Sequence, residues 1–362
     1  MIVRGGEIQS MTAGKIRRVV FFEKMIEAGA SSCYLSMFNM ERTTLRCMAV
    51  SVVQWFDVEY GAAGLAAATD NPDRIHWLRC FSLVTLHLGC IGVIWAGWSW
   101  TAVQVAAALY WVRMFGITAI YHRYFAHRTF RTSRFMQFVF AVLGASSAQR
   151  GPLWWAANHR EHHRESDTAA DPHSPIRRGF WWSHAGWFMS SRHLLTNYER
   201  IQDFARFREL VWLNRFDLTV PLALITGLYL TGAALQHLAP GLHVTGLQMV
   251  VWGFFISTTV LFHGTCTINS LAHLIGWQRY DTGDHSRNNF FLALITMGEG
   301  WHNNHHRYMT CTRQGFYWWE IDVTYYILKF LSWTGLIWDL RPVPATAYHP
   351  SEQLRREPAI AG

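Results

Sequence analysis

Charged residues are scarce in this chain of 362 residues, because Asp, Glu, Lys and Arg together make up 15% of it, against roughly 25% in an average soluble domain. Apolar residues make up 51%, and tryptophan alone occurs 19 times. Basic side chains outnumber acidic ones and give a formal net charge of +8, but no Lys- or Arg-rich run is present that would suit a nucleic acid. The composition favours a membrane protein and predicts no nucleic-acid partner.

Patterns of cysteine that would signal a disulfide framework or a zinc site are also missing. The six cysteines form no C-x-x-C pair and show no regular spacing, and we interpret them as reduced thiols. The first 70 residues contain no basic segment followed by an apolar core, so a cleavable signal peptide is not expected. These residues carry no clear indication of a fold.

Four apolar stretches have the length of membrane helices, which need about 20 residues each. They lie near 80–98, 102–121, 218–238 and 247–263. The connectors 97–101 and 239–246 contain no Lys or Arg, whereas the long segment 122–217 is rich in arginine. We therefore predict an all-α, multi-pass integral membrane protein with four transmembrane helices in two hairpins. The positive-inside rule places the long segments and both termini on the cytoplasmic side.

The apolar stretches allow two further interpretations. The stretch 135–148 is too short to span comfortably, so it is expected to lie at the membrane interface. The four longer stretches could also be core helices of a soluble protein, but their length, their pairing and the asymmetry of charge disfavour that alternative.

Histidine is concentrated in three short clusters that this topology places on one side of the membrane. In the second and third clusters the spacing is i, i+3, i+4, which puts the rings on one face of a helix. In the first cluster the spacing is i, i+5, about 140° apart on an ideal helix, so its two rings converge only if the helix ends or distorts. Imidazole suits Fe, Zn, Cu and Ni alike, and eight such nitrogens fit two ions better than one. The clusters are His122 and His127; His159, His162 and His163; and His302, His305 and His306.

Isolated histidines have a simpler interpretation. His87 and His263 each stand alone in an apolar stretch, and both are expected to be ordinary hydrogen-bonded side chains. A single H-x-x-H-H stretch would also be weak evidence for a metal, but two copies together with the H-x-x-x-x-H stretch make metal binding the better hypothesis.

The three clusters, in this order, resemble those of the membrane-bound fatty acyl desaturases of the stearoyl-CoA (delta-9) type. The resemblance extends over about residues 75–340 and includes Asp171-Pro-His173, the aromatic stretch 179–187 and the sequence Asn269-Ser-Leu-Ala-His273. It implies a desaturase domain at 75–340, between an N-terminal segment at 1–74 and a C-terminal tail at 341–362. The family's architecture is a membrane stem of four helices beneath a cytosolic helical cap that holds two Fe(2+) ions.

The resemblance also assigns ligands and substrate contacts to this chain. One iron would be bound by His122, His127, His159, His163 and His305, and the other by His162, His273, His302 and His306, with Asn269 acting through a water. The family's bent acyl tunnel has matching positions at Gln149, Trp155 and Thr265, and a basic residue of the head-group site remains at Arg192.

Several positions depart from the family's pattern. Cys266 stands where animal members have a tryptophan, Ala157-Asn158 replaces an Arg-Asp pair that contacts coenzyme A, and Arg150 replaces an asparagine. The iron site is therefore better supported than the thioester head-group site, and the acyl donor is either acyl-CoA or a membrane lipid.

The expected reaction is oxygen-dependent desaturation of a saturated acyl chain, for which no amino acid supplies the oxidant. The chain has no H-P-G-G haem-binding stretch, no G-x-G-x-x-G and no C-x-x-C, so electrons are expected from a separate cytochrome b5- or ferredoxin-type donor with its reductase. Asp171, Glu161 and Glu299 are candidate acceptors for the second nitrogens of the ligands. The alternatives are a membrane di-iron hydroxylase, which the DPH and NSLAH stretches disfavour, and a metal transporter, which spans poor in polar residues disfavour.

Overall fold

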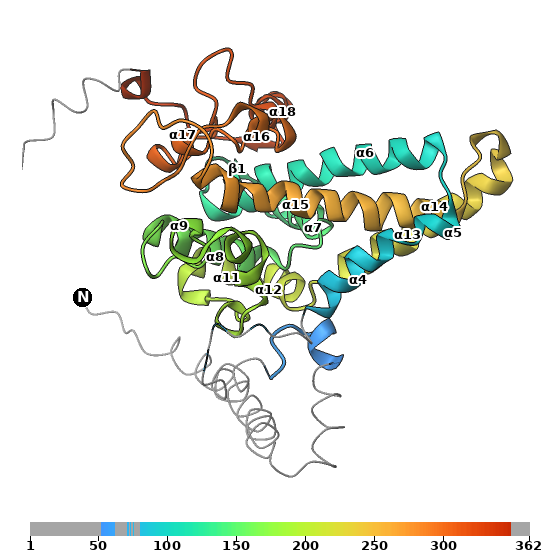
Figure 1. Ribbon diagram of the computed structural model, residues 1–362. Coiled ribbons are helices and arrows are strands. Elements are labelled where there is room, and N and C mark those ends of the chain that lie inside the picture. Colours follow the sequence, from blue (N-terminus) through green and yellow to red (C-terminus); the bar gives the residue numbers. More distant parts are fainter. Residues whose placement is uncertain (1–51, 62–70, 72, 74, 76–79, 349–362) are drawn as a thin grey trace, which may run out of the picture.

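The computed structural model describes residues 52–61, 71, 73, 75 and 80–348. Most of the expected N-terminal segment, with Cys33 and Cys47, and the end of the C-terminal tail lie outside the described residues. Helices dominate the described part (Figure 1). Its strands are β1 (Arg131–Thr132) and β2 (Ile337–Trp338), an antiparallel pair in which Arg131 faces Trp338.

Three helices among the described residues are long and apolar enough to cross a membrane. The first, Trp100–Ala126, joins α6 (Trp100–Phe115) to the π-helix η1 (Gly116–Ala126). The second is α13 (Thr219–Leu238). The third, Gly246–His273, is made of α14 (Gly246–Val250), the π-helix η6 (Val251–Ile256), α15 (Ser257–Ser270) and η7 (Leu271–His273). The expected spans at 102–121, 218–238 and 247–263 fall within these helices.

The first expected span, at 80–98, is shorter in the structure than the other three. It consists of α4 (Phe81–Cys90) and α5 (Val93–Ala96), 16 residues from Phe81 to Ala96 that break at a turn around Gly92. A helix that crosses the hydrocarbon core needs about 17 residues or more. The structure therefore supports three spanning helices by length, and a fourth span remains a prediction.

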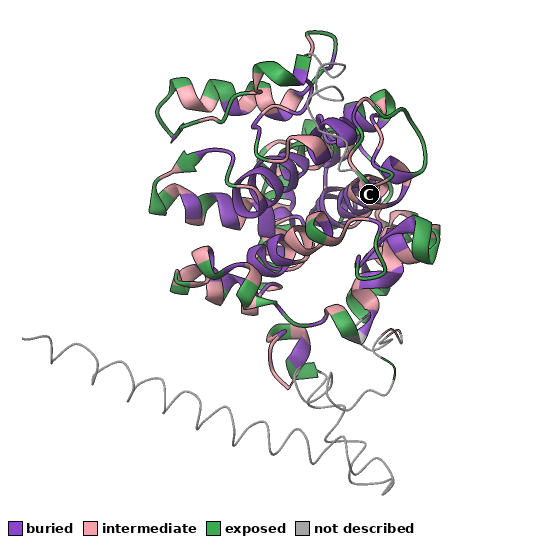
Figure 2. Ribbon diagram, turned by 90° about the vertical axis from the view of Figure 1, so that its left-hand side faces the viewer, coloured by how far each residue is buried: buried purple, intermediate pink, exposed green. Residues whose placement is uncertain are grey.

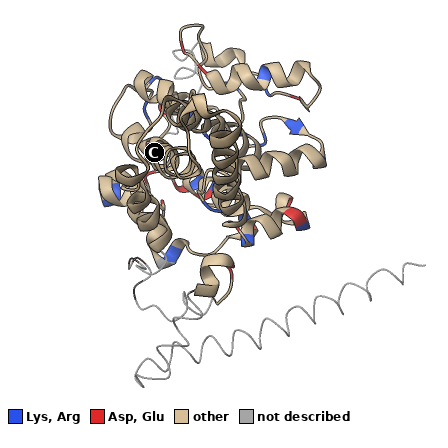
Figure 3. Cartoon of the chain, turned by 90° about the vertical axis from the view of Figure 1, so that its right-hand side faces the viewer, with Lys and Arg blue, Asp and Glu red and all other residues tan. Residues whose placement is uncertain are grey.

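Polar groups inside the long helices find partners within the protein. Arg113 on α6 is 1% exposed and donates to the hydroxyls of Ser257 and Thr258, both at 2.6 Å, which ties α6 to α15. Arg113 and Arg123 are the only Asp, Glu, Lys or Arg residues in the three long helices. Most of the described chain is tan in Figure 3, which colours only these four residue types. Since an unpaired charge at membrane depth is costly, these bonds explain how the arginine is tolerated.

The two isolated histidines are hydrogen-bonded, as expected. His87 Nδ1 lies 2.8 Å from the carbonyl of Leu83, and its Nε2 lies 3.0 Å from Nε2 of His263. His263 Nδ1 lies 3.0 Å from Nε2 of His184, so three rings link α4, α15 and the segment around His184.

Shorter elements surround one end of the long helices and form two groups (Figure 1). Before α13 come α7 (Arg134–Ala145), α8 (Pro152–Glu165), α9 (Pro175–Arg178), the π-helix η2 (Trp182–Gly186), α10 (Trp187–Met189), η3 (Ser191–His193), η4 (Tyr198–Arg200), α11 (Gln202–Ala205) and α12 (Arg208–Arg215). After α15 come α16 (Phe290–Ile295), α17 (His302–Arg307), α18 (Val323–Trp333) and η8 (Ala345–Tyr348).

The core lies where these groups meet η1, and Figure 2 shows the buried segments gathered there. Every residue of η1 is buried, and its apolar side chains pack with α7, α8, α12 and α18. The expected interface stretch 135–148 corresponds to α7, which has 12 residues and exposes Phe135 and Val139 on one side while burying Phe140 on the other. Because η1 is the innermost segment, side chains at its end point into the middle of these two groups of short elements, which together are called the cap below.

Candidate metal centre

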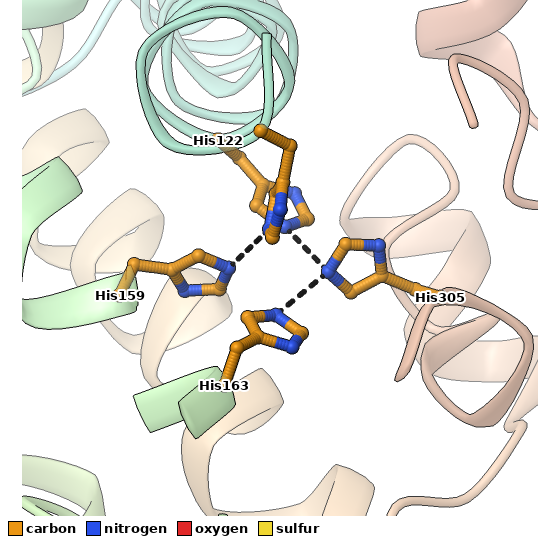
Figure 4. Close-up of side chains that lie close together, drawn as sticks. His122, His159, His163 and His305 are labelled. Carbon is orange, nitrogen blue, oxygen red and sulfur yellow. Dashed lines mark hydrogen bonds between the residues drawn. The ribbon is translucent and has the colours of Figure 1, made fainter. Parts of the chain in front are cut away.

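Five histidine rings converge in the centre of the cap from three segments. His122 lies in η1 and His127 directly follows it, His159 and His163 come from α8, and His305 comes from α17. One nitrogen of each ring lies within 4.8 Å of those of the others. Nε2 atoms face each other at 2.9 Å in the His122–His305, His127–His159 and His163–His305 pairs. Figure 4 shows His122, His159, His163 and His305 turned toward one another.

The π-helix explains how two histidines five residues apart can share this group. The amide of His127 donates to the carbonyl of His122 at 3.1 Å, which is the i→i+5 bond of a π-helix. This wider turn places residues five apart nearly above one another, and the two ring centres are 4.9 Å apart. The sequence predicted that convergence required a distorted helix, and η1 is that distortion.

The helix α8 carries the second cluster and begins at a well-defined point. Pro152 occupies its first turn, where a missing amide hydrogen costs nothing. Asn214 of α12 accepts the amide hydrogen of Trp154 at 2.8 Å. A side chain at Gly151 would place its Cβ 2.4 Å from the backbone of Asn214, so only glycine allows this close approach. The register of α8 against α12 is therefore fixed.

Four more histidines form a second group beside the first. His162 of α8, His273 of η7, and His302 and His306 of α17 have ligand nitrogens within 4.8 Å of one another, and all four are buried. The ring centres of His163 and His306 are 4.4 Å apart, so the two groups adjoin. Thus the structure brings all nine expected histidines together in groups of five and four.

The two asparagines inside the third cluster anchor α17. Asn303 and Asn304 are fully buried. Asn303 Oδ1 accepts the amide hydrogens of Arg279 and Tyr280 at 2.7 and 2.8 Å, and Asn304 Nδ2 donates to the carbonyl of Gln314 at 2.9 Å. Because these bonds tie a six-residue helix to loops on two sides, they orient the three histidines of α17.

Two of the three carboxylates expected beside the histidines are in place. Asp171 lies 3.1 Å from His162 Nδ1, and Glu299 pairs with His122 Nδ1. Burial by itself would raise the pKa of the Asp171 carboxyl, but the hydrogen bond from His162 lowers it below its usual range. Glu161 does not face a histidine; it pairs with Arg164 at 2.6 Å and Arg200 at 2.6 Å on the outer face of α8.

Sequence patterns did not indicate two further carboxylates of the same kind. Asp167 Oδ2 lies 3.0 Å from His273 Nδ1, and Asp284 Oδ2 lies 2.6 Å from His306 Nδ1. Asp167 follows α8 with a positive φ of 57°, and Asp284 lies in the loop between η7 and α16, so neither belongs to a helical repeat.

The residues present fit metal ions. A neutral imidazole that donates through Nδ1 to a carboxylate has its lone pair at Nε2, and in the second group Nε2 of His162 and Nε2 of His306 are buried without a hydrogen-bond partner. Burial lowers the pKa of His159, His163 and His305 well below the usual range, so these rings are neutral near pH 7. Neutral imidazoles whose inward nitrogens are fixed by outer carboxylates are typical metal ligands.

A tenth histidine lies at the edge of the second group. His173, from the D-P-H stretch, stacks on His162 with ring centres 4.3 Å apart, and these two rings and Asp171 form a third set of closely spaced donors. Its Nδ1 is buried without a hydrogen-bond partner. The sequence did not single out this ring as a ligand.

Two cavities meet at the histidines. The smaller, of about 30 Å³, is lined by His122, Glu299 and His302, and the larger, of about 420 Å³, extends away from them. Both are lined by Trp155, His159, Thr265 and Asn269, so these residues mark the junction. Cys266 lines the larger cavity.

The expected tunnel residues lie at this junction, but the expected head-group residue does not. Gln149 donates to the hydroxyl of Thr265 at 3.0 Å, and Trp155 stacks on His159 with ring centres 5.0 Å apart. Arg192 lines neither cavity; its guanidinium donates to Asp73 at 2.7 Å.

The two histidine groups agree with the family to which a comparison with known proteins assigns this chain. The family model described as fatty acid desaturase matches residues 98–331. The chain belongs to the fatty acid desaturase family. Its resemblance to the membrane-bound fatty acyl desaturases is thereby confirmed, and members of that family generally use a di-iron centre.

Curated relatives of this desaturase carry different names. It is 36% identical to an acyl-CoA 5-desaturase from Anemone leveillei, over 77% of this chain and 86% of the relative. It is 35% identical to an sn-1 stearoyl-lipid 9-desaturase from Anabaena variabilis (75% and 96%) and to a delta-9 acyl-lipid desaturase from Arabidopsis thaliana (79% and 88%). The desaturase is therefore an oxidoreductase, and its relatives differ in both acyl carrier and double-bond position.

Proposed function

We propose that this desaturase introduces a double bond at carbon 9 of a saturated fatty acyl chain carried by coenzyme A or by a membrane lipid, with O2 as oxidant. The observation that supports this most strongly is the pair of adjoining histidine groups at one end of an apolar cavity. The position of the double bond is supported by the relatives from Anabaena and Arabidopsis, whose names specify carbon 9.

In this proposal the two groups bind two Fe(2+) ions. One ion has the ligands His122, His127, His159, His163 and His305, and the other has His162, His273, His302 and His306, with Asn269 acting through a water. When bound, the pair supplies the oxygen activation needed to remove hydrogen from a methylene, which no amino-acid side chain can do.

The protein's own side chains orient these ligands and position the substrate. Glu299, Asp171, Asp167 and Asp284 each accept a hydrogen bond from the Nδ1 of a ligand and so keep its Nε2 deprotonated. At the junction of the cavities, the Gln149–Thr265 bond and the ring of Trp155 give the wall its shape beside His159. An extended acyl chain has no polar group at its centre, so a shaped apolar wall must select the methylenes that lie beside the iron.

We further propose that α4 with α5 is the fourth membrane span, giving two hairpins with the cap and both termini on the cytoplasmic side. The arginine-free connectors and the arginine-rich segment 122–217 support this orientation. In the same proposal the catalytic domain is residues 75–340, and electrons come from a separate cytochrome b5- or ferredoxin-type donor with its reductase.

Fatty-acid profiling in a desaturase-deficient host tests the function. Expression should give a new monounsaturated acid, located at carbon 9 by derivatisation and mass spectrometry, and the purified protein should contain close to two irons per chain. His302→Ala and His162→Ala should abolish the product while the chain still inserts in the membrane. A hydroxylated acid without a new double bond would favour a hydroxylase, and turnover in both variants would refute the ligand assignment.

A further inference from the structure

The larger cavity reaches the outer surface between two apolar helices. Its wall includes Phe81 and Leu86 of α4 and Leu222 and Ile225 of α13. Phe81 and Leu222 are also 49% and 45% exposed, so they form part of its rim. Both belong to the first turn of a helix whose outer face exposes apolar side chains, so the cavity opens sideways, toward the region that lipid would occupy.

An unpartnered polar group lies in the wall of this cavity. Gln54, in the helical stretch 52–56, is 3% exposed, yet neither its amide nitrogen nor its amide oxygen has a hydrogen-bond partner. The indole N–H of Trp187, another lining residue, is also buried without a partner. A buried amide that makes no hydrogen bond costs about 1–3 kcal/mol. These groups are therefore suited to a ligand with a hydrogen-bonding group, such as an acyl ester carbonyl.

In the part of the chain that the structure describes, the arginines beside the cavity already take part in ion pairs. Arg150 lines it and pairs with Asp217 at 3.1 Å, while its second nitrogen donates to the carbonyl of Leu194. Arg178 and Arg192 share Asp73, at 2.9 and 2.7 Å. Arg215 pairs with Asp57 at 2.8 Å. These four arginines therefore form no unpaired basic patch for the phosphates of coenzyme A, which arginine binds through free, charge-assisted hydrogen bonds.

We infer that the acyl group reaches the histidines as the ester of an uncharged or zwitterionic membrane glycerolipid, which enters between α4 and α13 with its ester carbonyl hydrogen-bonded to Gln54. This rests on the proposed function, since it specifies the carrier for the same cavity. The glycerolipid stays in the membrane while one acyl chain extends past Trp155 to the junction of the cavities. The carrier needs no free cation, which agrees with the paired arginines.

The test offers both carriers to the purified, iron-loaded full chain in the same membrane. The protein is reconstituted in vesicles of saturated diether phospholipid, which has no acyl ester, with reduced ferredoxin or with cytochrome b5 and its reductase. The probes are phosphatidylcholine with a deuterated stearoyl group at sn-1, and deuterated stearoyl-CoA. We expect a deuterated monoene in the phospholipid and at least tenfold less from the thioester.

The possible failures are distinguishable. Product from the thioester at an equal or higher rate overturns the lipid inference and leaves the desaturase function intact. No product from either probe, in protein that retains its iron, contradicts the proposed function itself.

A variant pair tests the role of Gln54 separately. Gln54→Leu removes both amide atoms at similar volume and should raise KM for the phospholipid about fivefold, with kcat nearly unchanged, because one hydrogen bond in the bound state is lost. Val53→Leu changes an exposed neighbour in the same helical stretch and should leave KM unaltered. Equal KM values for Gln54→Leu and the unmodified chain would overturn the assignment of Gln54.

Discussion

At the scale of single residues, two glutamates show that the surroundings of a carboxylate decide its role. Glu299 is 6% exposed and lies between His122 and Arg123. It accepts a hydrogen bond from the guanidinium of Arg123 at 3.1 Å. Glu161 is on the same helix as three of the histidines but points away from them toward Arg164 and Arg200. The sequence made both equally plausible partners for a ligand.

This difference predicts that replacing glutamate with glutamine affects iron binding at position 299 but not at position 161. Glu299→Gln removes the carboxylate that accepts the Nδ1 hydrogen of His122, and loss of such a partner typically weakens metal binding by about 10- to 100-fold. When the protein is dialysed against a graded series of chelator concentrations, the Glu299→Gln variant should lose its iron at a lower concentration than the unmodified chain. Glu161→Gln is the matched control and should retain iron like the unmodified chain. Identical iron retention in the two variants would mean that Glu299 does not orient a ligand.

The candidate site was largely predictable at this scale, but its outer contacts were not. Eight of the nine histidines follow from local clustering: six lie in i, i+3, i+4 repeats, which place rings on one helical face, and the other two form the i, i+5 pair of the first cluster. His273 came from the family resemblance, since a lone histidine after an apolar helix has no repeat around it. Asp167 and Asp284 were missed because their partners, His273 and His306, lie far away in the sequence and loops have no periodicity.

At the scale of elements, glycine determines how closely α4 packs on the third long helix. A Cβ at Gly89 would lie 2.1 Å from the ring of Phe255, and one at Gly92 would lie 3.0 Å from Val251. Hydropathy alone predicted a continuous span at 80–98, because it does not register the turn at Gly92 that ends α4. In the same way, the i, i+5 spacing of the first cluster indicated a distorted helix, but it did not specify a π-helix of 11 residues.

The packing of α4 leads to a prediction for Gly89→Ala. Alanine favours a helix over glycine by up to about 1 kcal/mol, but forcing a methyl group into a filled site costs about 1–3 kcal/mol, so the net effect should be destabilising. The measurement is the midpoint of thermal unfolding of the solubilised protein, and Phe255→Ala in the same background should restore part of the loss. Gly227→Ala in α13 is the control, because its Cβ would meet nothing within 4 Å. Equal midpoints for the two alanine variants would contradict this account of the α4 contact.

At the scale of the whole molecule, the histidines add a second connection between parts of the chain that already pack around η1. The nine rings come from positions 122 to 306 and from four elements: η1 with the residue that follows it, α8, η7 and α17. Two of these elements end long apolar helices, and two belong to the cap. Pairs of Nε2 atoms face each other at 2.9–3.1 Å. Two lone pairs at that distance repel each other unless a proton or a cation lies between them.

Removal of metal should therefore loosen the cap without extracting the membrane helices. A ligand present at 100 times its Kd stabilises the folded state by about 2.7 kcal/mol, so chelation should lower the unfolding midpoint and make α8 and α17 cleavable in limited proteolysis of membranes. The preceding helix α6 (Trp100–Phe115) should stay protected, since its insertion in the membrane does not depend on the ions. Zn(2+) should restore protease resistance but not turnover, because it binds imidazole and has no redox chemistry. If chelated protein resisted protease as well as the metal-loaded form, hydrogen bonds such as those of Asn303 and Asn304 would by themselves hold the cap together, and the histidines would serve the reaction alone.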